Sequence, residues 1–176
     1  MISHAAFADD ATAFELVKRG NQYVGVQSKD KVVQIRSEKS IASLTPNIWY
    51  VVYYDPDATF KATEVKFGAG KKMDVSHPWR ILEMADDAHK VLDKDKLKVD
   101  SDKAIKIATS QPLLANLKVK ATKLKLEHGD NGPQWRVQLW AAKLKNPNDD
   151  ADIGVVIIST DDGSVIKTDL HPNSVD

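Results

Sequence analysis

The stretch Trp135-Arg136-Val137-Gln138-Leu139-Trp140 determines the fold that we expect for this chain. Side chains alternate between the two faces of a β-strand, so one face here is apolar and the other carries Arg136, Gln138 and Trp140. The apolar face is typical of a strand packed against a helix, which leaves the second face toward solvent or a partner. A similar stretch, Trp49-Tyr50-Val51-Val52-Tyr53-Tyr54, lies earlier in the chain and places Tyr50 and Tyr54 on the corresponding outer face.

These two stretches belong to a longer internal similarity. Residues 13–17 correspond to 104–108 upstream, and Ser-His-Pro at 76–78 corresponds to Leu-His-Pro at 170–172 downstream. We therefore expect an α+β fold of two tandem repeats, residues 9–78 and 99–172, each a short helix packed on an antiparallel β-sheet. Apolar side chains at helical spacing after Pro78, followed by the charged DKDKLK segment, predict a linking helix and hinge over residues 79–98.

Local patterns predict the elements of each repeat. Helices are expected over residues 11–19 and 103–110, and strands over 22–27, 31–36, 48–54, 62–67 and 72–76 in the first repeat and over 117–127, 135–143, 153–160 and 164–170 in the second. Gly68-Ala69-Gly70 and Asp161-Asp162-Gly163 are expected hairpin turns, because glycine adopts positive φ at little cost.

The second repeat resembles a PepSY domain through SDKAIKIATS (101–110), QWRVQLW (134–140) and IGVVIISTDDGSVIKTDL (153–170). The first repeat shares only WYVVYY (49–54) and GAGKKMDV (68–75) with that pattern. The resemblance implies an extracytoplasmic α+β module that binds proteins or inhibits proteases and has no catalytic residues. The tandem arrangement is also similar to that of the beta-lactamase inhibitory protein, in which a concave, aromatic-rich sheet face binds the target enzyme.

Composition excludes several classes of function. The 176 residues contain 25 Lys+Arg and 25 Asp+Glu, and this zero net charge argues against a binder of nucleic acid, which needs a basic surplus. The absence of Cys excludes disulfides, thiol catalysis and Cys-ligated metals. The apolar runs are too short to span a membrane, and no nucleotide-binding or nucleophile motif is present, so we expect no enzyme activity and no cofactor.

Two features raise the question of a metal site. His77 and His171 are each followed by Pro, and we interpret both pairs as strand ends because no ligand cluster accompanies them. Residues 146–152 are rich in Asp and Asn, but they lack the order of ligands in a calcium-binding loop, so we interpret them as a solvated turn. We therefore predict no metal.

Charge is unevenly distributed along the chain. Residues 90–126 contain 10 Lys and 4 Asp, whereas residues 146–176 contain 7 Asp and 1 Lys. Lys118, Lys120, Lys123 and Lys125 are expected on the outer side of one edge-like strand. They either protect that edge from unwanted pairing, which we favour, or form an electrostatic surface for an acidic partner.

The N-terminus bears on the compartment. Ala6-Phe7-Ala8 before Asp9 has the small-x-small form of a signal-peptidase site, although Met1 to Phe7 is too short for a whole signal peptide. The motif indicates an exported, extracytoplasmic protein, and the alternative is a chance pair of alanines.

Tyr50, Tyr54, Arg136 and Trp140 are the candidate partner-binding residues, because Tyr, Trp and Arg are enriched at binding hot spots. The alternative is that the repeats pack against each other, or that a loop covers the rings. The leading hypothesis is a non-catalytic exported module that binds a protein, with inhibition of an enzyme or peptidase as one form. The alternative hypothesis is a structural domain of the cell envelope that self-associates through its sheets.

Overall fold

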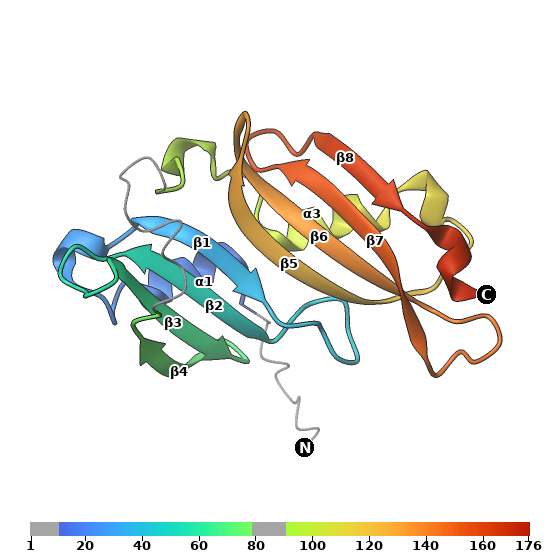
Figure 1. The fold of residues 1–176 in the computed structure, drawn as a ribbon, viewed down its shortest axis with the longest axis horizontal. Helices are drawn as coiled ribbons and strands as arrows, with labels where there is room; N and C mark the ends of the chain where they lie inside the picture. Colours follow the sequence, from blue (N-terminus) through green and yellow to red (C-terminus); the bar gives the residue numbers. More distant parts are fainter. Residues whose placement is uncertain (1–10, 79–90) are drawn as a thin grey trace, which may run out of the picture.

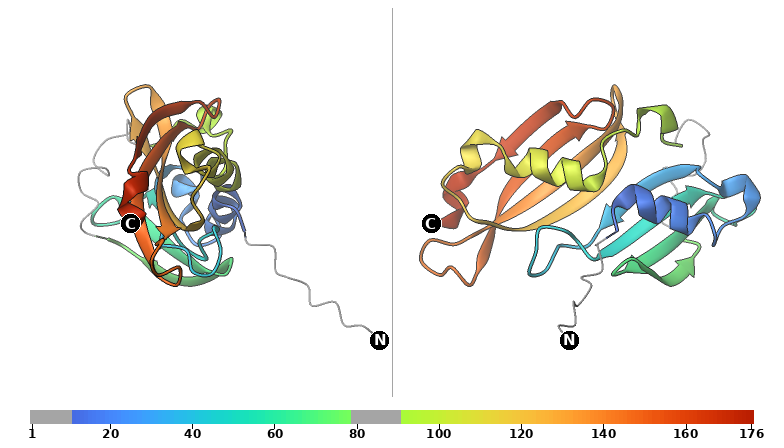
Figure 2. Two further views of the ribbon diagram at one scale, coloured as in Figure 1. Left: turned by 90° about the vertical axis from the view of Figure 1, so that its right-hand side faces the viewer. Right: turned by 180° about the vertical axis from the view of Figure 1, so that it is seen from behind.

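The computed structural model describes residues 11–78 and 91–176, which form one antiparallel sheet of eight strands with two α-helices on one face (Figures 1 and 2). The elements are α1 (Ala13–Gly20), β1 (Val32–Ser37), β2 (Ile48–Tyr54), β3 (Ala62–Gly68), β4 (Lys71–Ser76), α3 (Ser101–Thr109), β5 (Val119–Gly129), β6 (Gly132–Ala142), β7 (Asp150–Ser159) and β8 (Val165–Leu170), with the 3-10 helices η1 (Val26–Ser28), η3 (Lys94–Lys96), η4 (Pro112–Leu114) and η5 (Pro172–Val175). The strands lie in the order β4-β3-β2-β1-β5-β6-β7-β8. We call the sheet face opposite α1 and α3 the outer face.

The expected fold of two separate helix-on-sheet repeats joined by a linking helix is wrong. β1 pairs antiparallel with β5, with Ile35 opposite Leu126 and Arg36 opposite Lys125, so the strands of both halves form one sheet. Alternation along a strand specifies its buried face but not its neighbours, and pairing β1 with β5 satisfies two edges that would otherwise be open. Of the residues expected to link the repeats, 79–90 lie outside the described residues, and 91–98 contain only η3.

Buried polar side chains fasten this junction. Ser37 Oγ accepts a hydrogen bond from the Leu124 N–H at 2.9 Å, which joins β1 to β5. Beyond the end of β1, the Ser40 N–H donates to the Thr122 carbonyl at 2.8 Å, and the Thr122 N–H donates to Ser40 Oγ at 2.9 Å. Because buried donors and acceptors are costly when unpaired, these contacts specify how the β1–β2 loop crosses β5.

The two helices meet at their N-termini on the other face. Thr12 caps α1 in a capping box with Glu15. The first free N–H groups of α1 are satisfied from the second half of the chain, because Ala13 N–H donates to Ser101 Oγ at 3.0 Å and Phe14 N–H donates to Asp100 Oδ1 at 3.1 Å. Ser101 and Asp100 lie at the start of α3, so the two helix starts position each other.

One apolar core lies between the helices and the sheet. Trp49 and Trp135, which begin the two similar stretches, are both buried and contact edge to face with centroids 6.5 Å apart. Phe14 of α1 stacks on Trp135 at 6.2 Å. The Trp135 indole N–H donates to the Val99 carbonyl at 2.8 Å, so its polar atom is satisfied. The core is therefore shared by both halves of the chain.

Several local predictions can be compared directly with this structure. The two predicted helices are confirmed within two residues at each end, and Gly163 has φ 76° in its turn, as its position required. The strand expected over residues 22–27 is wrong, because this segment forms a turn followed by η1. None of the helices within the described ranges has the length and apolar character that a membrane span requires.

Candidate functional site

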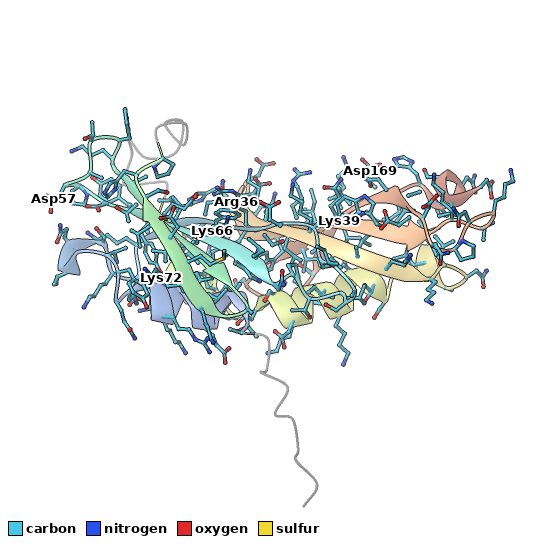
Figure 3. The ribbon with its side chains drawn as sticks, turned by 90° about the horizontal axis from the view of Figure 1, so that it is seen from below. Arg36, Lys39, Asp57, Lys66, Lys72 and Asp169 are labelled. Carbon is cyan, nitrogen blue, oxygen red and sulfur yellow. The ribbon has the colours of Figure 1, made fainter. Side chains whose placement is uncertain are left out.

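The ladders of the sheet place one outer-face residue from each strand in a continuous line, which we call the outer row. Each member is directly opposite the next in the strand register. In order from β4 to β8 the outer row is Asp74, Lys66, Tyr50, Arg36, Lys125, Arg136, Ile157 and Lys167. Five of these eight side chains are cationic, and they come from five different strands. Figure 3 shows Arg36 on the side of the sheet away from the helices.

The row brings together two of the four residues predicted from the sequence. Tyr50 and Arg136 are both members, separated by Arg36 and Lys125, about 14 Å at the usual strand spacing. Tyr54 and Trp140 lie on opposite sides of the row, because β2 and β6 run in opposite directions. The four residues therefore share a face but do not form one cluster.

Tyr50 lies between two cations. The Arg36 guanidinium is 4.4 Å from the centroid of its ring, and Lys66 Nζ is 5.3 Å from the same centroid. The phenolic O–H donates to Glu38 Oε1 at 2.9 Å. Cation–π attraction and this hydrogen bond hold the half-buried ring in place between Lys66 and Arg36 in the row.

Two nearly buried glutamates beside the row neutralise part of its charge. Glu64 pairs with Arg36 at 2.7 Å, and Glu127 pairs with Lys125 at 2.5 Å and with Arg136 at 3.1 Å. The glutamate side chains are only 10% and 13% exposed, whereas Arg36, Lys125 and Arg136 are 33%, 37% and 46% exposed. A molecule approaching the outer face therefore meets the cations before it meets their counter-ions.

The Glu127 carboxylate is held in its charged form. Burial alone would raise its pKa, but hydrogen bonds from Lys125 and Arg136, together with their positive charges, lower the pKa below its usual value. Glu127 thus orients two cations of the outer row at neutral pH and well into the acid range.

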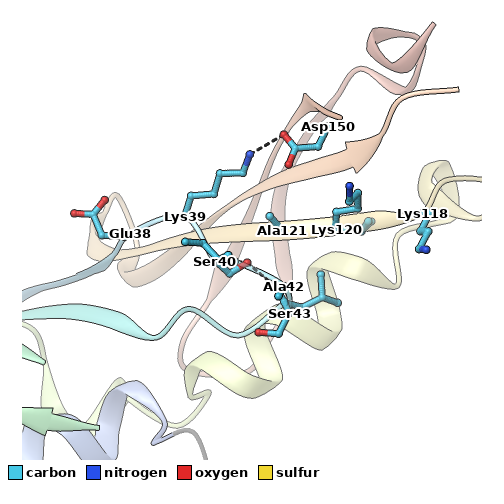
Figure 4. Close-up of a pocket in the computed structure, with 12 residues that line it drawn as sticks. Glu38, Lys39, Ser40, Ala42, Ser43, Lys118, Lys120, Ala121 and Asp150 are labelled. Carbon is cyan, nitrogen blue, oxygen red and sulfur yellow. Dashed lines mark hydrogen bonds and ion pairs between the residues drawn. The ribbon is translucent and has the colours of Figure 1, made fainter. Parts of the chain in front are cut away.

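Trp140 contacts Lys39, which lines a groove. Lys39 Nζ is 4.7 Å from the centroid of the Trp140 ring and 2.7 Å from Asp150 Oδ1. The groove, about 920 Å³, is lined by residues 38–44 of the β1–β2 loop, by residues 118–121 and by Asp150 (Figure 4). Lys39 thus connects the half-buried Trp140 to this groove and extends the outer face beyond the row.

Tyr54 has a packing role. It packs against a second small core cluster on the outer face, formed by Val33, Val52 and Ala62, together with Val91. Lys31 Nζ lies 6.0 Å from its ring. Tyr54 is therefore partly engaged in packing within the protein, and the two halves of the chain do not stack face to face.

The lysines of β5 were expected to protect a sheet edge. They do not, because β5 lies between β1 and β6. A β-bulge between Val119 and Ala121 also changes the face on which the side chains before it point. Lys120 Nζ donates to the carbonyls of Pro147 and Asn148, whereas Lys123 and Lys125 pair in register with outer-face residues of β6. The edge-protection interpretation is therefore wrong.

The histidines and the acidic loop make contacts within the protein. Thr63 Oγ1 lies 3.0 Å from His77 Nδ1 and donates to Asp55 at 2.6 Å, which ties the end of β4 to β3. His171 Nε2 lies 3.3 Å from Asp169. In the loop, Asp150 pairs with Lys39. Within residues 11–78 and 91–176, no three His, Cys, Asp or Glu side chains are grouped so as to hold a metal ion.

No family model, curated protein or solved structure matches this chain. The PepSY resemblance therefore stays a prediction. The case for the outer face as a functional site depends on its geometry alone. Sequence reasoning missed Arg36, Lys66 and Lys39, because each gains its role from a neighbouring strand or loop. Alternation around Ile35 and Val65 was the one available signal that Arg36 and Lys66 point outward.

Proposed function

We propose that this chain is a non-catalytic protein-binding module, and that the outer face of its sheet binds an acidic surface of a partner protein. The observation that carries the proposal is the outer row, in which five exposed or half-exposed cations cross the sheet, while Glu64 and Glu127, the counter-ions of Arg36, Lys125 and Arg136, are nearly buried. Complementary charge steers encounter and selects partners.

The dimensions and chemistry of this face support a protein as the ligand. From Lys66 on β3 to Lys167 on β8 the row spans about 29 Å at the usual strand spacing, which is the width of a standard protein interface. Tyr50, Arg136 and Trp140 are of the residue types that supply most binding energy in such interfaces. An extended polyanion is a poorer match, because the chain as a whole is neutral.

Inhibition of an enzyme is the form of binding that the PepSY resemblance favours, and the outer face would then cover part of the enzyme. An extracytoplasmic location belongs to the same proposal. Its sequence basis, Ala6-Phe7-Ala8, lies outside the described residues.

The test is capture of a partner by two variants of equal net charge. The first is Arg36→Gln, Lys125→Gln and Arg136→Gln, which neutralises the centre of the outer row. The matched control is Lys18→Gln, Lys103→Gln and Lys106→Gln, which removes three exposed cations from α1 and α3.

Wild-type and control proteins should capture the same polypeptide from an extract of the source cells at low salt, and the row variant should lose it. Raising the ionic strength should weaken capture by the wild type. Equal capture by the row variant and the control, with both folded, would exclude the outer row as the contact.

A further inference from the structure

The second exposed feature of this fold is the edge strand β8. Residues 165–169 are all exposed, including the apolar Val165 at 40% and Ile166 at 50%. The side chains of Lys167 and Asp169 are 64% and 56% exposed, and their charged ends lie 3.9 Å apart on the outer face. Such an edge presents a row of backbone groups to which another strand can pair.

The register shows which backbone groups point away from the sheet. The His171 N–H donates to the Ile153 carbonyl of β7 at 2.8 Å. In an antiparallel ladder, residues that bond to a given neighbour alternate with residues that face the other way. From Leu170 to Lys167 the pairing with β7 is regular, so Thr168 and Leu170 direct their N–H and C=O groups outward.

We propose that two copies of this chain pair antiparallel through β8, about a two-fold axis at Thr168, into one continuous sheet. With this register the outward N–H and C=O groups of Thr168 bond to those of the second Thr168. Lys167 then lies opposite Asp169 of the second copy, and Asp169 lies opposite its Lys167. On the helix face, Ile166 lies opposite Leu170 of the second copy.

The charge pattern of β8 indicates that a second copy of the chain is the strand that pairs with this edge. A strand with the sequence Lys-Thr-Asp is complementary to itself only when it is antiparallel and centred on the Thr, because every other register opposes like charges or leaves the charges unpaired. The contact is isologous, so it closes at two copies. It leaves the outer face open, and the proposed protein-binding surface would extend across both copies.

The other edge strand, β4, is less suited to the same pairing. A β-bulge interrupts it between Lys72 and Asp74, at the centre of the corresponding register, whereas the bulge of β8 lies at Ile166, outside the regular run of residues 167–170. β4 also begins with Lys71 and Lys72, and Lys72 lies over the Tyr23 ring at 5.6 Å. Consecutive lysines and a central bulge are devices that prevent edge pairing.

The test is the dissociation constant of the dimer from sedimentation equilibrium over a range of concentrations. Lys167→Asp and Asp169→Lys should each weaken the dimer at least tenfold, because each opposes like charges twice across the axis. The double variant, with the two charges exchanged, should restore wild-type affinity. Lys72→Asp on β4 is the matched control and should leave the affinity unchanged.

A backbone variant makes the test independent of charge. Thr168→Pro removes only an outward N–H group, which an edge strand tolerates, so the monomer should keep its circular dichroism spectrum and lose the dimer. A wild-type protein that stays monomeric at millimolar concentration, a double variant that stays as weak as the single ones, or assembly beyond two copies would each overturn the proposal. The dimer is measured on the purified chain without a partner, and the capture variant changes only Arg36, Lys125 and Arg136, so either proposal can fail while the other stands.

Discussion

The contact between Phe14 and Trp135 gives a direct prediction about the single core. Phe14 lies on α1 in the first half of the chain, and Trp135 lies on β6 in the second half. Their rings stack with centroids 6.2 Å apart and an interplanar angle of 26°. If the halves share one core, the two side chains must contribute jointly to the free energy of unfolding.

The magnitude follows from the burial and contacts of each ring. Trp135 is fully buried, and Trp135→Leu also leaves the Val99 carbonyl without its indole donor, so this variant should lose about 3 kcal/mol. Phe14 is half-buried, and Phe14→Leu nearly conserves its volume, so it should cost about 1 kcal/mol. An aromatic pair contributes about 1 kcal/mol beyond burial, so the double variant should lose about 3 rather than 4 kcal/mol.

Urea denaturation of the four proteins measures this coupling energy. The control combines Trp135→Leu with Met73→Ala. Residues 135 and 73 lie on strands five positions apart in the sheet, about 24 Å, so the effects of the two substitutions on the free energy of unfolding should add. Two independently folded halves would give additive effects for Phe14 and Trp135 as well, within about 0.4 kcal/mol, and that result would refute the reasoning.

Three further predictions concern the sheet. Ser37→Ala should destabilise the protein by about 2 kcal/mol in urea denaturation, because it leaves the buried Leu124 N–H without an acceptor at the β1–β5 junction. Gly154→Ala should cost about 3 kcal/mol by the same measurement, because Gly154 has φ 108° and a Cβ there would lie 2.0 Å from a carbonyl oxygen of β8. The lowered pKa of Glu127 means that its ion pairs stabilise the fold above its unfolded-state pKa of about 4.5 and are lost as the pH falls through the lower folded value. Glu127→Gln should therefore be less stable than the wild type at pH 7, and thermal denaturation from pH 7 to pH 3 should show that difference shrink.

Local features of the fold could be predicted because they depend on neighbours in the sequence. The alternation in residues 135–140 correctly identified Trp135, Val137 and Leu139 as buried, and Gly70 and Gly163 have positive φ in the two expected hairpin turns. The prediction of a strand over residues 22–27 was wrong because a short apolar alternation there competes with a turn that begins at Gly20.

The joining of the halves could not be predicted, because strand pairing across the middle of the chain leaves no local pattern. It depends on contacts such as Ser37 with Leu124, whose members are far apart in the sequence. The outer row depends on seven registers at once, and a shift of one residue in any ladder would turn the side chains of that strand to the other face. Tyr50 and Arg136 were found as single outer residues, but their place in one line of cations required the registers.

The most direct test of the protein-binding account is site-specific photo-crosslinking in the source cells. A photoreactive phenylalanine analogue replaces Lys123, which is exposed on the outer face beside the row, or Lys103, which is exposed on α3. We predict a crosslinked partner from position 123 but not from position 103, and its loss when Arg36, Lys125 and Arg136 are also changed to Gln. Crosslinks to the same partner from position 103, or crosslinks from position 123 that survive the loss of the three cations, would contradict the assignment of the outer face as the binding surface.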